Sequence, residues 1–153
     1  MAATQLTTAV SLKRAPNSAK VALIPSAAYT AANTPVISVT LKGCEWYDSF
    51  NALLQLDTLG GASNTVDVYF QGLAPDGSTW FDMASMTQKV ATGDYMFTYR
   101  PAGAWEFTVQ DAAIGAGAVN TANLPSQMRV KVTMGGTVTI TFALDLEFFR
   151  RGA

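Results

Sequence analysis

Residues 127–149 read QMRVKVTMGGTVTITFALDLEFF, and apolar and polar side chains alternate along most of this run. A period of two is that of a β-strand with one buried face. Two such strands, at 127–134 and 137–149, flank the pair Gly135-Gly136, which is a typical hairpin connection. The run therefore predicts an antiparallel hairpin with one apolar face.

The same alternation recurs upstream and predicts further short strands. They lie at residues 36–41, 50–57, 65–72, 79–83, 95–100 and 105–110. Pro75-Asp76-Gly77-Ser78 is a turn sequence, so the strands on either side of it should form a second hairpin. Residues 111–126, rich in Ala, Gly and Asn, are predicted to be a long loop.

About eight short strands with turns between them predict an all-β fold. We expect an antiparallel β-sandwich, either a jelly roll or an immunoglobulin-like sandwich, with a barrel as the alternative. No segment shows a convincing amphipathic helix, which disfavours an α/β enzyme scaffold.

The first 34 residues are rich in Ala, Thr, Ser and Asn and contain two prolines, with a third at Pro35. No helical period persists there, and each proline interrupts a strand ladder. We therefore predict an extended N-terminal arm at 1–34, followed by a β-sandwich domain at 35–153. Apolar anchors such as Leu12 and Tyr29 allow the arm to lie on its own sandwich or on a neighbour.

Charged residues make up only 14% of the 153 residues, against about 25% in an average soluble domain. Part of the surface must be uncharged, which is typical of a subunit covered by partners; a neutral sheet face that is simply exposed is the alternative. Residues 1–44 carry four basic residues and no acid, whereas 45–153 carry six basic and eleven acidic residues. This asymmetry suits head-to-tail contact between copies, or a solvated basic tail.

Residue types that catalysis needs are scarce. The chain has no histidine, so it has neither a Ser-His-Asp triad nor an imidazole metal site. Carboxylates near Cys44 raise a thiol pKa, so a reactive cysteine is not expected. A glycosidase would need two of the carboxylates Asp67, Asp76, Asp82 and Asp94 as acid and base. Nothing in the sequence marks any two of them as such a pair. We expect no enzyme, no catalytic or metal-binding residue and no cofactor.

A single cysteine cannot form an intrachain disulfide, which fits assembly in a reducing cytoplasm. We expect no signal peptide, because the apolar run at 21–24 ends at Pro25, and no membrane span. Several aromatic side chains can either form a sugar-binding platform or fill a core or a subunit interface. They are Trp46, Tyr47, Trp80, Phe81, Tyr95, Tyr99 and Trp105.

Residues 66–83, VDVYFQGLAPDGSTWFDM, combine a strand, an Asp-Gly turn and a return strand that carries a tryptophan. Residues 129–144, RVKVTMGGTVTITFAL, form a second, later pattern around Gly-Gly-Thr. Together the two patterns resemble small head and neck proteins of tailed bacteriophages. Similar Asp-Gly turns also occur in fibronectin-like and glycan-binding sandwiches.

The resemblance implies a structural protein of the virion, assembled in the host cytoplasm. A capsid decoration or cement protein that stabilises the head lattice is the first expectation. A head–neck or tail connector and a glycan-binding module on a virion are the alternatives. Implied partners are the major capsid protein or other virion proteins, and further copies of the chain, with a trimer favoured. No direct contact with nucleic acid or membrane is expected.

We expect contacts with partners in the arm, at an aromatic pair and in the long loop. The candidate interface residues are Leu12, Arg14, Val21, Leu23, Ile24, Tyr29, Trp46, Tyr47, Ile114 and Val119. On this hypothesis, deletion of residues 1–34 should leave a soluble fold that no longer stays on particles.

Overall fold

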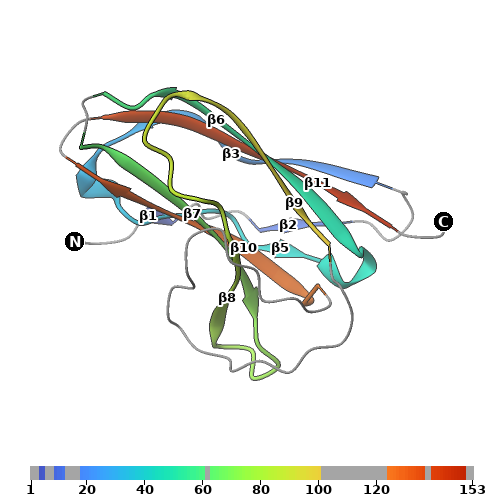
Figure 1. Cartoon of the computed structure of the whole chain (residues 1–153). Helices are drawn as coiled ribbons and strands as arrows, with labels where there is room; N and C mark the ends of the chain where they lie inside the picture. Colours follow the sequence, from blue (N-terminus) through green and yellow to red (C-terminus); the bar gives the residue numbers. More distant parts are fainter. Residues whose placement is uncertain are drawn as a thin grey trace.

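Two β-sheets packed face to face make up the fold (Figure 1). The computed structural model describes residues 4–5, 9–12, 18–60, 63–100, 124–136 and 139–150. Within these ranges the helical structure consists of two single 3-10 turns, at Ala31–Asn33 and Cys44–Trp46. No helix of the described chain is long and apolar enough to cross a membrane. The predicted all-β sandwich is confirmed.

The first sheet is built around β10, which pairs with β7 along one side and with β4 and β5, one after the other, along the opposite side. β8 extends the sheet beyond β7, and the short strands β1 and β2 run parallel to β4 and β5. The strands of this sheet are β1 (Thr4–Gln5), β2 (Val10–Ser11), β4 (Val36–Ile37), β5 (Leu41–Lys42), β7 (Thr65–Leu73), β8 (Trp80–Ser85) and β10 (Gln127–Gly135).

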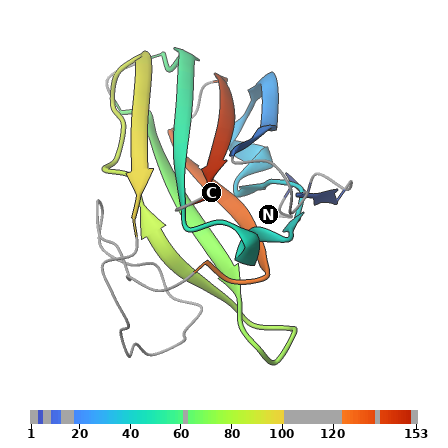
Figure 2. The same cartoon turned by 90° about the vertical axis from the view of Figure 1, so that its right-hand side faces the viewer.

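The second sheet has the order β3-β11-β6-β9 and is antiparallel throughout. Its strands are β3 (Ser18–Tyr29), β6 (Ser49–Thr58), β9 (Gly93–Tyr99) and β11 (Ile140–Phe149). Figure 2 shows β9 (yellow) at one edge of this sheet and β3 (blue) at the other.

The strand order is that of a jelly roll. With β4 and β5 counted as one interrupted strand, the strands from β3 to β11 can be numbered 1 to 8 along the chain. The two sheets then read 1-8-3-6 and 2-7-4-5, which is the jelly-roll arrangement. An immunoglobulin-like sandwich would instead place strands 1, 2, 5 and 4 in one sheet. Of the two predicted sandwich types, jelly roll and immunoglobulin-like, the described strands form the jelly roll.

The predicted hairpin at 127–149 is wrong, although both of its strands exist. β10 belongs to the first sheet and β11 to the second, so the chain crosses from one layer to the other after Gly135. Gly136 has φ +103°, and a Cβ atom there would overlap the side chain of Asn64. Alternation shows only that each strand has one apolar face. It cannot distinguish faces that lie side by side from faces that oppose each other across a core.

The arm predicted at 1–34 also differs from the structure. Residues 18–29 form β3, which pairs along the length of β11. Leu23 and Ile24 lie in the same hydrophobic core as the strands after residue 35. The composition allowed the arm to lie on the sandwich of its own chain or on a neighbouring subunit. The described part of the arm lies in the sandwich of its own chain. A cut at residue 34 would therefore remove an integral strand.

Most of the other predicted strands are confirmed: β6, β7, β8 and β9 cover the segments at 50–57, 65–72, 79–83 and 95–100 to within a few residues. The segment at 36–41 is divided, because the hydroxyl oxygen of Ser38 accepts the amide hydrogen of Val130 at 2.8 Å in place of a strand carbonyl. The predicted strand at 105–110 and most of the loop at 111–126 lie outside the described residues.

Aromatic rings fill one end of the core between the sheets. Phe50 stacks on Tyr99, with ring centroids 5.1 Å apart and an interplanar angle of 6°. Phe70 of the opposite sheet stacks on Phe97, with centroids 5.0 Å apart. Such contacts add to the hydrophobic gain of burying the rings and hold the two layers in register.

Candidate docking surface

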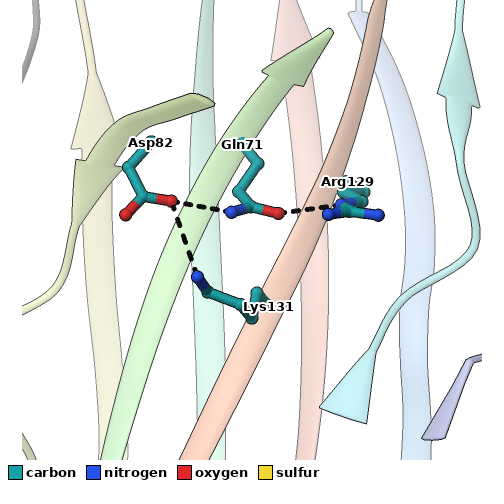
Figure 3. Close-up of polar contacts among 4 residues, drawn as sticks. All are labelled: Gln71, Asp82, Arg129 and Lys131. Atoms are coloured by element: carbon teal, nitrogen blue, oxygen red, sulfur yellow. Dashed lines mark hydrogen bonds and ion pairs between the residues drawn. The ribbon is translucent and has the colours of Figure 1, made fainter. Parts of the chain in front are cut away.

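The outer face of the first sheet carries a row of bonded polar side chains from three neighbouring strands (Figure 3). Gln71 Nε2 donates to Asp82 Oδ1 at 2.8 Å, and Arg129 Nε donates to Gln71 Oε1 at 2.8 Å. Lys131 Nζ lies 4.0 Å from Asp82 Oδ1. We call Gln71, Asp82, Arg129 and Lys131 the outer-face network.

Both cations of the network also lie over aromatic rings. The Arg129 guanidinium carbon is 4.3 Å from the centroid of Trp80, and Lys131 Nζ is 5.1 Å from that of Tyr69. Burial, together with the negative charges of Asp67 and Asp82, raises the pKa of the Tyr69 hydroxyl. Asp82 is buried, and a buried carboxylate is tolerable only when it is bonded and paired, which Gln71 and Lys131 achieve here.

Sequence reasoning missed this network. Asp82 is next to the last residue of the strand predicted at 79–83, but in the structure it lies within β8, buried and directly opposite Gln71. The signal was present in the predicted hairpin: the two residues stand at equal distances on either side of the turn at 75–78. Residues opposite each other in an antiparallel pair point to the same face, so the two side chains had to meet.

The remaining carboxylates of the glycosidase hypothesis are dispersed. Asp67 accepts from Gln88 Nε2 at 2.9 Å, and Asp94 lies on the other sheet. Asp76 accepts the amide hydrogens of Ser78 and Thr79, each at 2.9 Å. The bond from the Thr79 hydroxyl first, and these two amide bonds second, lower the pKa of the Asp76 carboxyl to about 2. Within the described residues no group of three potential metal ligands occurs.

Cys44 is fully buried. Its Sγ lies 3.7 Å from the carbonyl oxygen of Leu41. Burial first, and the charge of Glu45 second, raise the pKa of the thiol to about 12. A thiolate nucleophile is therefore not available at neutral pH.

The candidate interface residues separate into three groups. Those of the predicted arm that the structure describes, together with Tyr47, are buried in this chain's own core: Leu12, Val21, Leu23, Ile24, Tyr29 and Tyr47. Of these, Val21 also lines an open groove on the outer face of the second sheet. Trp46 is 41% exposed and remains a candidate contact. Arg14, Ile114 and Val119 lie outside the described residues.

The aromatic side chains considered for a sugar platform are spread over both sheets and the core. Tyr47, Phe81 and Tyr99 are buried. Trp80 lies under a guanidinium group, and Tyr95 lies under the ammonium group of Lys89 at 4.5 Å. Trp105 is outside the described residues. The described rings therefore offer no common open face to a sugar.

The outer face of the second sheet contains an open groove of about 380 Å³. Its floor is mostly apolar, and its charged members include an exposed ion pair, with Lys20 Nζ 3.8 Å from Glu147 Oε1. Such pairs contribute little to stability in water, and a partner that covers this face must offer polar groups to these charges. The groove is lined by Lys20, Val21, Ala22, Asn51, Leu53, Met96, Asp145, Leu146 and Glu147. We call this surface the outer groove.

No protein-family model matches the sequence, and a search of curated proteins finds no relative. The class of the protein is therefore defined by its fold, an all-β jelly-roll sandwich.

Proposed function

We propose that this chain is a non-enzymatic structural protein of a tailed-bacteriophage virion, most simply a decoration or cement protein of the head. The observation that carries the proposal is the jelly-roll strand order. Jelly rolls recur in viral capsid domains, and also in lectins and cupins. A fold alone does not define a function, so the surface must support the choice.

The surface supports docking rather than catalysis. The outer groove presents Leu53 and Met96 beside the charged residues Lys20, Asp145 and Glu147, and Met96 is 62% exposed. Exposed apolar side chains rimmed by polar and charged residues are typical of a surface that a partner covers. The outer-face network is bonded within the chain and is not arranged around an open reaction centre.

Decoration of a lattice also suits modest contacts of this kind. A groove of this size supports only a weak contact on its own. Repeated around a particle, such contacts add through multivalency and retain the protein firmly.

The proposal is tested on particles. Virions banded by density, from the phage whose genome encodes the chain, should contain it in tens to hundreds of copies by quantitative mass spectrometry. Genes for a portal, a protease and a major capsid protein should lie nearby. A copy number of about six to twelve would favour the head–neck or tail connector, and absence from particles would reject the virion role.

A groove variant then tests the surface. Leu53→Lys places a cation on the floor of the outer groove and should lower the occupancy of purified protein on heads that lack it. Gln88→Lys, on an exposed residue outside the groove, is the matched control and should bind normally. A glycan array, with tryptophan fluorescence on titration, separates docking from the sugar-binding alternative.

A further inference from the structure

We propose that the outer groove binds an extended segment of a partner protein that presents a lysine or arginine to Asp145 and an apolar side chain to Leu53 and Met96. This contact chemistry rests on the docking function proposed above, since it concerns the same groove. The partner is defined by the order in which charged and apolar side chains stand across the second sheet.

Four strands lie side by side beneath the groove, and side chains in register cross them in rows (Figure 2). One row runs from Ala22 of β3 over Asp145 of β11 and Leu53 of β6 to Met96 of β9. All four residues line the groove. Because side chains opposite each other on paired strands share a face, the Asp145 carboxylate stands between two apolar neighbours, Ala22 and Leu53.

The next row is bonded within the chain. Lys20 Nζ lies 3.8 Å from Glu147 Oε1, and Thr98 Oγ1 donates to Asn51 Oδ1 at 2.9 Å. Within the described ranges, the side chain of Asp145 has neither a hydrogen bond nor an ion pair. The groove therefore contains one carboxylate that its described neighbours do not neutralise.

The rest of this face is acidic as well. The strands of the second sheet carry a single lysine, Lys20, against four carboxylates, and each of these groups is exposed or half-buried. The carboxylates are Asp57, Asp94, Asp145 and Glu147. Arg100 and Arg150 follow the last residues of β9 and β11 but do not line the groove. Such a face attracts a cationic segment and repels polyanions such as nucleic acid.

A partner that covers Leu53 and Met96 also removes water from Asp145. A carboxylate that loses water without gaining a new donor costs free energy, so a neutral or acidic segment binds poorly. A lysine or arginine supplies a charge-assisted hydrogen bond to the carboxylate, and its methylene stem covers the apolar side chain of Leu53.

The spacing of the row suits an extended segment that crosses the strands. Asp145 and Met96 are two strands apart, which is about 10 Å, and Leu53 lies between them. Side chains on one face of an extended chain recur every two residues, or about 7 Å. A segment with its cation at Asp145 therefore places the second following side chain between Leu53 and Met96, where an apolar residue fits.

A peptide titration tests this chemistry without particles. The probe is the acetylated and amidated pentapeptide Ala-Arg-Ala-Leu-Ala, and its control carries glutamate in place of arginine. With the isotope-labelled full chain, the arginine peptide should shift the amide signals of residues 51–53 and 145–147 with a Kd of about 1 mM. The glutamate peptide should bind about tenfold more weakly or less. Absence of these shifts, or equal affinity for the two peptides, would overturn the proposed partner chemistry.

Variants of the carboxylate locate the contact. Asp145→Asn keeps the shape of the side chain and should weaken binding of the arginine peptide about tenfold. Asp57→Asn is the matched control, because Asp57 is an exposed carboxylate of the same sheet that does not line the groove. Its effect should stay below about twofold at about 0.15 M salt. Equal losses would show that the peptide responds only to the charge of the whole face.

A charge reversal provides a gain that misfolding cannot produce. Asp145→Lys should bind the glutamate peptide more tightly than the arginine peptide, since the charges of groove and ligand are then exchanged. An unchanged preference for arginine would contradict the contact at Asp145.

Binding to heads separates the partner chemistry from the virion proposal. If the wild-type chain binds the arginine peptide but no heads, the virion role fails and the groove chemistry stands. If heads take up Asp145→Asn as well as Asp57→Asn, the groove chemistry fails and the decoration role stands. Any self-association of the chain should be equal in the wild type and in Asp145→Asn. Its loss in the variant would place a second copy in the groove and reject a different protein as the partner.

Discussion

Gln71 is a polar side chain in a fully buried position, and both ends of its amide are bonded. Gln71→Ala removes one hydrogen bond from Asp82 and one from Arg129, both charged groups. Losing bonds to one buried and one partly buried charge should lower the free energy of unfolding by about 2–3 kcal/mol, measured by urea denaturation.

Gln88→Ala is the matched control, because Gln88 also donates to a carboxylate but does so at an exposed position. Its effect should stay within about 0.5 kcal/mol. Equal effects of the two substitutions would show that burial does not strengthen the outer-face network.

The thiol of Cys44 should be inert in the folded protein. With a pKa of about 12, roughly one thiol in ten thousand is ionised at pH 8, so a disulfide reagent should react only after unfolding. Because the pKa is higher in the folded state than in the unfolded state, the folded state holds more protons above pH 9. The thiol's contribution to the free energy of unfolding should therefore fall as pH rises from about 9 towards 12. Cys44→Ala should lack this part of the decline, and rapid labelling of the native thiol would contradict its burial.

At the scale of the element, β3 shows where sequence patterns fail. Val21 and Leu23 alternate as a strand should, but Ile24 is buried directly after Leu23, where the register with β11 shifts. Pro25 follows the shift and suggested a break. Because a bulge places two consecutive residues on one face, periodicity alone could not reveal this strand.

The strand should contribute strongly to stability. Leu23→Ala deletes a buried side chain and should lower the free energy of unfolding by about 2–5 kcal/mol in urea. Val90→Ala removes a largely exposed side chain and should change it by less than about 0.5 kcal/mol.

Deletion of 1–34 removes β3 whole, so we now expect an unfolded or insoluble product rather than a soluble domain. A soluble, cooperatively folding 35–153 chain would show that β11 can serve as an edge strand.

Pairing was harder to predict than the strands themselves. β7 and β8 were identified together because Pro75-Asp76-Gly77-Ser78 fixes the turn between them. Gly135-Gly136 carries no such information, since glycine serves a two-residue hairpin and a corner between sheets equally well. The outer groove was invisible for a related reason: it needs β3, β11, β6 and β9 side by side, and no local pattern encodes that order.

At the scale of the whole molecule, the last strand holds the second sheet together. β11 lies between β3, near the start of the chain, and β6, from its middle, and its partners in β3 are more than a hundred positions away in the sequence. A chain ending at Gly136 lacks β11, and β3 then has no described neighbour left in its sheet. The inner face of the first sheet would also lose the layer that covers Val130 and Val132. Because the hydrophobic gain of both layers depends on their contact, the 1–136 chain should be unfolded, with no dispersed amide signals in its NMR spectrum and no cooperative thermal transition. If that chain instead melts cooperatively, the first sheet is stable without its partner, and the sandwich is not one folding unit.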